Sequence, residues 1–167
     1  MSERSPAPGS LALVECLVNT LNLESGADAL DTVAGRDRLG LTEGELEQAR
    51  ELRESLRAVL LAHAGHPPHR EVTPLGELLA DAPLYVAVQD DGSATLAPAD
   101  TGPLLSRVAA AVAEALVAGT WTRLKACEAE TCHWAYYDRS PAGRGRWCSM
   151  QVCGARAKMR RYRAKEG

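Results

Sequence analysis

Apolar residues recur at helical spacing in several segments of the first part of the chain. Leu13, Leu17 and Leu21 repeat every four positions within residues 10–24. The longest such pattern covers residues 42–65, where an apolar residue recurs every three or four positions. Both segments are therefore predicted to be amphipathic helices, each with one face on a core.

The longer helix has a recognisable start and end. Thr42 and Glu45 form a capping box at its beginning. Charged residues occupy the positions between its apolar residues, and those of its polar face, Glu54 and Arg57 among them, are expected to face water. Two prolines directly after residue 66 end the helix, because proline cannot continue the hydrogen-bond ladder.

Three histidines, His63, His66 and His69, follow at intervals of three around the end of this helix. The spacing suits metal ligands, but Pro67 and Pro68 break the helix that would align the rings. We therefore expect a solvated helix end here.

The remaining segments before residue 120 predict one β-hairpin and two more helices. Residues 84–98 read as a hairpin with an Asp-Gly turn. A short helix is expected before it, over residues 73–81, and an alanine-rich helix after it, from Pro103 to Gly119.

The sequence changes character near residue 120. Residues 1–120 contain 8 Lys and Arg against 18 Asp and Glu, a net charge of −10, whereas residues 121–167 contain 11 against 4, a net charge of +7. The first part has 21 of the 22 leucines, and the second has six of the seven aromatic residues and four of the five cysteines. We predict two domains: an acidic body (1–120), and a basic C-terminal module (121–167) that suits a polyanionic partner.

The cysteines of the C-terminal module form two pairs, Cys127-x4-Cys132 and Cys148-x4-Cys153. Zinc binds four thiolates tetrahedrally, and two short-range pairs joined by a loop supply them. Disulfides and unrelated buried thiols are the alternatives. The module has a single leucine and cannot build a sufficient core, so Zn²⁺ is the predicted cofactor, in a closed structural site. His133 is expected on the surface or as an outer-shell donor.

Basic residues cluster in the loop between the cysteine pairs and in the helix after Cys153. The arginine fork matches phosphate, so double-stranded DNA is the expected partner, with a solvated basic face or a protein-binding surface as alternatives. The apolar stripe of that helix, which includes Met159 and Tyr162, is expected to pack over the zinc core. The candidate nucleic-acid contacts are Arg139, Arg144, Arg146, Arg156, Lys158, Arg160, Arg161 and Arg163.

Two polar residues of the first helix are candidates for a ligand pocket. Glu15 and Asn19 lie one helical turn apart and could both point at a small molecule. The alternative is that they form the wet edge of an amphipathic helix.

The C-terminal module resembles the CGNR zinc finger family. The matching segments are Tyr137-Asp138-Arg139-Ser140, Arg146-Trp147-Cys148-Ser149-Met150 and Cys153-Gly154-Ala155-Arg156. The body is similar to the helical ABATE domain through its opening, LALVECLVNTLN. The resemblance implies a ligand-sensing domain followed by a DNA-binding zinc finger. Ala155 replaces the family's signature asparagine, a change that bears on sequence recognition and leaves the four cysteines and Arg156 intact.

The predicted fold is α+β and mainly α: a helical body with one β-hairpin, then a small zinc-stabilised, treble-clef-like module that ends in a basic helix. The predicted function is zinc-dependent, DNA-binding transcription regulation. The alternative is a protein-interaction adaptor whose basic module docks on an acidic partner.

Further expectations follow from motifs that are missing. No P-loop, dinucleotide fingerprint or nucleophile elbow occurs in the sequence, so an enzyme is not expected. Neither an apolar run of membrane length nor a signal-peptide pattern is found, which predicts a cytoplasmic protein without a membrane partner. A small-molecule effector of the body and a homodimer are the other partners expected.

Overall fold

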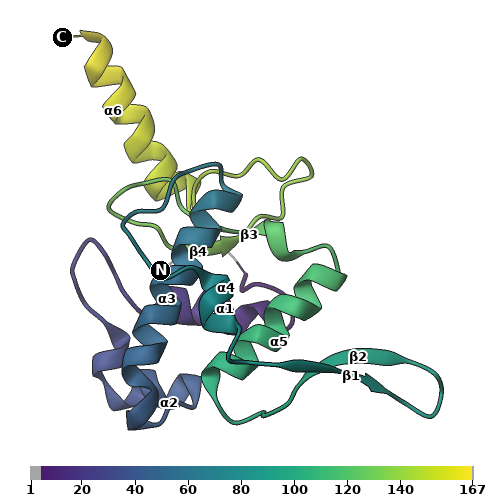
Figure 1. Ribbon diagram of the computed structural model, residues 1–167. Coiled ribbons are helices and arrows are strands. Elements are labelled where there is room, and N and C mark those ends of the chain that lie inside the picture. Colours follow the sequence, from purple (N-terminus) through teal and green to yellow (C-terminus); the bar gives the residue numbers. More distant parts are fainter. Residues whose placement is uncertain (1–4, 167) are drawn as a thin grey trace.

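The computed structural model describes residues 5–166 and confirms a mainly helical α+β fold (Figure 1). Two antiparallel hairpins accompany the helices. The helices are α1 (Leu11–Val18), α2 (Val33–Leu39), α3 (Leu46–His63), α4 (Leu75–Leu79), α5 (Leu104–Val117) and α6 (Ala155–Glu166). The strands are β1 (Leu84–Val88) and β2 (Ala94–Pro98), which form the first hairpin, and β3 (Leu124–Ala126) and β4 (Ala135–Tyr137), which form the second.

Helix α3 is the centre of the fold, because α1, α4, α5 and β3 all contact it. Its predicted apolar stripe is confirmed, and the side chains of Leu52, Leu56 and Leu60 have no exposed area. The predicted capping box is confirmed too, since the backbone N–H of Thr42 donates to Glu45 Oε2 over 3.0 Å. The other oxygen of that carboxylate accepts the N–H of Leu104, at 2.9 Å, so one side chain serves the starts of two helices.

The expectation that Glu54 and Arg57 face water is wrong. Arg57 is fully buried and Glu54 is 4% exposed, because partners surround α3 on more than its apolar face. Arg57 Nη2 donates to Val18 O at 2.9 Å, and its Nε lies 3.3 Å from Glu54 Oε2. Arg53 donates to the same carboxylate, at 2.8 Å, and to Asp28, at 2.7 Å. These buried charges are tolerable because each has an opposite charge beside it.

Two local predictions also differ from the structure. Helix α1 ends at Val18 instead of residue 24, and the chain turns back so that Leu21 and Asp28 form an isolated bridge. Helix α2 was not predicted, since its seven residues carry no regular apolar stripe. It is held at its start by Thr32, whose Oγ1 accepts the N–H of Gly35 at 3.1 Å.

The hydrophobic core continues from the body into the C-terminal module. Trp121, Leu124, Ala126 and Ala135 belong to the same buried cluster as the leucines of α1, α3 and α5. The strands β3 and β4 thus pack on the body, and β3 lies directly against α3. Of the described helices, none is long and apolar enough to cross a membrane.

The histidines at the end of α3 lie at this junction, so the expectation of a solvated helix end is wrong for two of them. His63 Nδ1 lies 2.8 Å from Leu124 O, and its ring meets Trp121 edge to face, at 5.0 Å between centroids. His69 Nε2 lies 2.9 Å from Glu54 Oε2. The rings are half-buried because the C-terminal module covers the end of the helix.

Asn19, the residue after α1, joins the body to β4 through both ends of its side-chain amide. Its Nδ2 donates to Ala135 O at 3.0 Å, and its Oδ1 accepts the N–H of Ala135 at 2.7 Å. Ala135 has no exposed area, so water cannot replace these two bonds without opening the junction.

Replacing Asn19 with alanine should therefore destabilise the whole protein. Two buried backbone groups would lose their partners, and we expect a loss of about 2 kcal/mol in the free energy of unfolding. Chemical denaturation followed by circular dichroism measures it. Gln48→Ala, which removes an exposed amide from α3, is the matched control and should change stability little. Equal stability of the two variants would contradict this role of Asn19.

Candidate metal centre and nucleic-acid interface

The four predicted cysteine ligands converge on one point. The Sγ atoms of Cys127, Cys132, Cys148 and Cys153 all lie within 4.8 Å of one another. The Cys132–Cys148 and Cys148–Cys153 separations are 3.6 and 3.8 Å. Four sulfurs at about 2.3 Å from a tetrahedral ion would be about 3.8 Å apart. The donor set and its spacing therefore fit a metal site.

Local backbone geometry presents the first pair of cysteines. Cys127 directly follows β3, and its N–H donates to Trp134 O at 2.9 Å, which extends the hairpin by one step. The N–H of Cys132 turns back to Ala129 O, at 2.8 Å. His133 then has a φ of 46°, a left-handed conformation that a non-glycine residue seldom adopts and that reverses the chain into β4.

The second pair comes from the start of the terminal helix. Cys148 lies at the end of the long loop, and Cys153 lies in a π-helical turn over residues 150–154 that leads directly into α6. Ser149 Oγ accepts the N–H of Val152 at 3.3 Å and holds the turn. One pair therefore lies between the strands of a hairpin that was not predicted, and the other lies at the start of the predicted terminal helix.

Four thiols at this distance compete for protons. Hydrogen bonds from Cys132 and Cys148 lower the pKa of Cys127 to about 2. The same contact raises the pKa of Cys132 to about 12, and the pKa of Cys148 is raised further. Mutual repulsion therefore opposes the ionisation of all four thiols, and a divalent ion at the centre of the cluster would remove that penalty.

Two further residues approach the cluster. His133 was expected on the surface or as an outer-shell donor. It is buried, and its Nδ1 lies 2.9 Å from Cys127 O, a hydrogen bond that fixes the backbone of a ligand. Arg57 approaches from the body: burial lowers the pKa of its guanidinium, while the charges of Glu54 and Cys132 oppose that shift. The body thus brings a buried positive charge within electrostatic reach of the thiolates.

Asp138 organises the loop between the cysteine pairs. Its carboxylate accepts hydrogen bonds from Lys125 Nζ (3.0 Å), the N–H of Ser140 (3.0 Å) and the N–H of Gly145 (2.7 Å). Burial alone would raise the pKa of Asp138, but these bonds hold it well below its usual range. A Cβ on Gly145 would lie 2.8 Å from Asp138 Oδ1, so the close approach requires glycine. Sequence reasoning missed this buried ion pair.

Three of the predicted nucleic-acid contacts have partners within the protein. Arg139 donates to Ser5 O (2.9 Å) and Pro6 O (2.6 Å). Arg146 pairs with Glu128, and Arg156 pairs with Glu24 of the body over 3.0 Å. All eight predicted contacts are exposed to solvent, and the other five are Arg144, Lys158, Arg160, Arg161 and Arg163.

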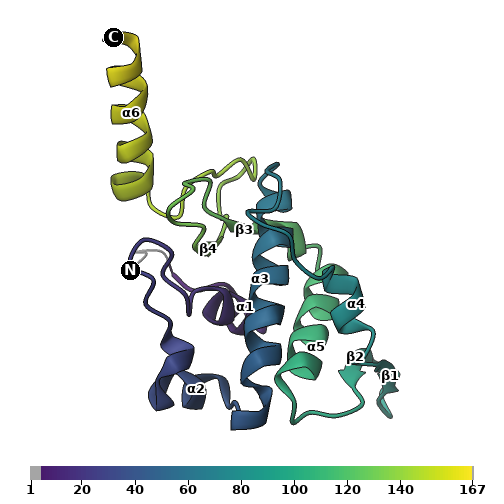
Figure 2. The same cartoon turned by 60° about the vertical axis from the view of Figure 1, so that its left-hand side comes forward.

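Helix α6 projects away from the rest of the molecule in both views (Figures 1 and 2). The expectation that its apolar stripe packs over the metal centre is wrong, since Met159 is 52% exposed and Tyr162 59%. The helix leaves the metal-binding turn in a direction that carries both its apolar and its basic residues into solvent.

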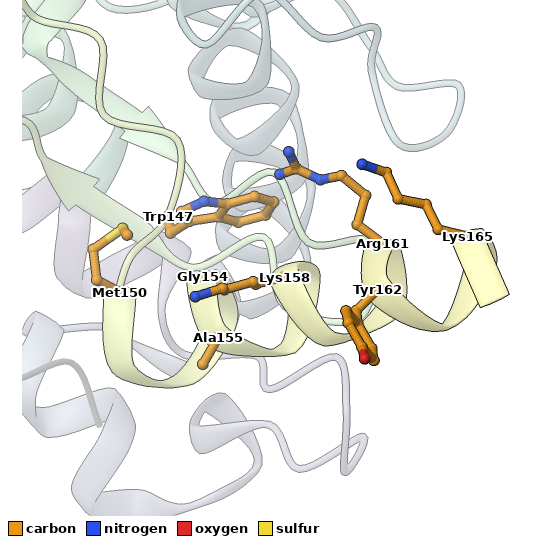
Figure 3. Close-up of a pocket in the computed structure, with 8 residues that line it drawn as sticks. All are labelled: Trp147, Met150, Gly154, Ala155, Lys158, Arg161, Tyr162 and Lys165. Atoms are coloured by element: carbon orange, nitrogen blue, oxygen red, sulfur yellow. The ribbon is translucent and has the colours of Figure 1, made fainter.

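A cleft of about 640 Å³ lies beside α6. Trp147 and Met150 form one side of it, and Arg161 and Lys165 extend from the helix on the side where Trp147 lies (Figure 3). Lys158 lines it as well. The predicted set omitted Trp147 and Lys165; the aromatic residue before Cys148 was a signal that could have located this cleft. An aromatic ring with three cations around it suits a phosphate-bearing polymer.

The two candidate ligand-binding residues make contacts within the protein. Glu15 Oε2 accepts the N–H of Ala7 at 2.5 Å, and burial raises the pKa of its carboxyl. The amide of Asn19 is directed at β4, as described above. Their role in binding a small molecule stays a prediction.

Comparison with protein families identifies both parts of the chain. Residues 11–119 match the ABATE family, described as "Putative stress-induced transcription regulator", and residues 123–166 match the CGNR zinc finger. The first match spans more than half of the sequence, so the chain belongs to the ABATE family and ends in a CGNR zinc finger. Both resemblances seen in the sequence are confirmed. No curated protein matches the chain.

Loss of one ligand should abolish metal binding. We expect one metal ion per chain in the wild type and none in Cys148→Ser, because three thiolates leave the coordination shell open. Elemental analysis of the purified proteins measures this. Cys16→Ser is the matched control, since this half-buried cysteine lies in α1, and it should retain the ion. A wild type without metal, or with the four thiols found as disulfides, would contradict the assignment.

Proposed function

We propose that the protein is a zinc-dependent transcription regulator that binds double-stranded DNA through α6 and the cleft beside it. The observation that carries this proposal is the cleft itself, where Trp147 faces the cations of a projecting helix. Phosphate contacts from exposed Lys and Arg supply most of the affinity of such an interface.

Zinc is the ion that the donor set favours. Four thiolates are soft ligands, and a tetrahedral S4 site is typical of zinc. Cys127, Cys132, Cys148 and Cys153 would hold the ion, which would contribute folding free energy. Four protein ligands fill the coordination shell, which supports a structural and not a catalytic role.

The internal contacts of three arginines support a division of labour within the module. Arg139 and Arg156 tie the module to the body, whereas Arg146 pairs with Glu128 inside the module. The cations of α6 then remain available for phosphate. We propose that Arg144 and the α6 residues make the DNA contacts. Arg139 and Arg156 orient the module on the body, and Arg146 holds the loop between the cysteine pairs against Glu128.

One observation favours the alternative function, a protein-interaction adaptor that docks on an acidic partner. Met159 and Tyr162 expose apolar surface on the same helix that carries the cations, and aromatic residues beside basic ones also suit an acidic protein partner. We also predict that a small-molecule effector binds the body and that the protein is cytoplasmic.

Salt dependence of binding separates the two functions. If about five side chains reach phosphates, the logarithm of the DNA association constant should fall against the logarithm of salt concentration with a slope of about −4 to −5. Arg161→Ala should weaken binding to every duplex sequence and reduce the slope by about one. Fluorescence anisotropy with a labelled random-sequence duplex measures both.

Arg38→Ala is the matched control. Arg38 is an exposed arginine of α2, which lies at the far end of the molecule from α6 (Figure 2). It should leave affinity and slope close to those of the wild type. Binding that is independent of salt and insensitive to Arg161→Ala would overturn the DNA proposal, and capture of an acidic peptide by the same surface would then favour the adaptor.

A further inference from the structure

The hairpin of β1 and β2 has one face that is entirely apolar. Residues directly opposite each other in the ladder, and those two positions along, share a face. The side chains on this face are Leu84, Val86, Val88, Ala94, Leu96 and Pro98. Val86 is 63% exposed, Val88 67% and Leu96 41%, so the outer half of the face lies in solvent.

The hairpin also projects well beyond the helices (Figure 1). It is a sheet of two strands, so each strand has an outer edge without a strand partner among the described residues. Packing on α5 supports β2, but Val86 and Val88 remain largely exposed, and open strand edges favour association. The exposed apolar face and the open strand edges both indicate that another surface covers the hairpin in the functional state.

An open groove of about 870 Å³ separates this face from α5. Val86 and Leu96 line it on the hairpin side, and Ala110 and Val117 line it on the helix side. Val117 is 80% exposed, and the groove is lined mostly by apolar residues, with Arg107 and Glu114 as its charged ones. The molecule therefore places an exposed apolar arm and an apolar groove next to each other.

We propose that a second copy of this chain covers both, with the hairpin of each copy lying in the groove of the other. A two-fold interface must be self-complementary, and a protruding arm beside a groove of matching chemistry meets that requirement within one chain. A small molecule that filled the groove would leave part of the apolar face bare, because Val88, which is 67% exposed, does not line the groove.

Charge complementarity supports this occupant. Asp90 and Asp91 lie at the tip of the hairpin. Arg107 lines the groove from the first turn of α5, a short connection after β2, whereas Glu114 lines it about two turns farther along the helix. When two hairpins pack antiparallel about a two-fold axis, the tip of each lies over the base of the other. The acidic tip of one copy then approaches the positive charge of the other.

The dimer gives the proposed regulator a second module, because each copy brings its own metal centre and α6. Two-fold proteins read two half-sites in inverted orientation. The dimer itself does not depend on DNA binding, so it is tested on the protein alone.

Two pairs of variants test the interface by light scattering during gel filtration. On the hairpin, Val86→Lys places a charge on the apolar face, while Tyr85→Lys places it on the opposite face of the same strand. On α5, Val117→Lys charges the groove, while Leu116→Lys charges a neighbouring exposed position that does not line it. The wild type and the two controls should have twice the 17.8 kDa mass of one chain, and the two face variants should have that of one chain.

Circular dichroism checks that each variant is folded, and Val88→Lys, at a more exposed position, replaces Val86→Lys if that protein fails to fold. A wild type that is monomeric at about 100 µM would overturn the proposal, since a dimer weaker than this is not a stable assembly. A dimer that survives both face variants, or that the two controls disrupt equally, would overturn it as well.

Discussion

The packing of α3 against β3 is the interaction on which the rest of the structure depends. The C-terminal module has one leucine, so it cannot bury enough apolar surface to fold by itself. It is stabilised from two directions instead: four cysteines gather around a metal position on one side, and Leu124, Ala126 and Ala135 enter the core of the body on the other. The body and the C-terminal module are therefore stabilised as one continuous unit.

This arrangement fixes the direction of α6. The helix starts in the turn that carries Cys153, and that turn is held by the same cluster that holds Cys127 at the end of β3. Asn19 anchors the hairpin to α1, and Arg156 ties the first turn of α6 to Glu24. These contacts connect α1 and α3 to the basic helix, which is the physical route that the proposed regulation requires.

Much of this was predictable from sequence, and the misses share a cause. Periodicity located α1 and α3, helix-end and turn residues located α5 and the first hairpin, and cysteine spacing located the metal centre, because these signals are local. Periodicity failed for Glu54 and Arg57, since it assumes that one face of a helix is buried and cannot register a second partner such as the C-terminal module. It failed in the opposite sense for Met159 and Tyr162, whose apolar stripe has no element packed over it in the described structure.

Hydrogen–deuterium exchange with and without the metal ion tests the shared core most directly. Buried amides of a cooperative unit exchange only when the whole unit unfolds. A ligand that stabilises the unit therefore slows the exchange of all these amides. Removing the ion with a chelator should accelerate exchange in α3, which lacks any metal ligand, as well as in β3, β4 and α6. Acceleration confined to residues 123–166, with α3 unchanged, would contradict the account and show that the body and the C-terminal module fold independently.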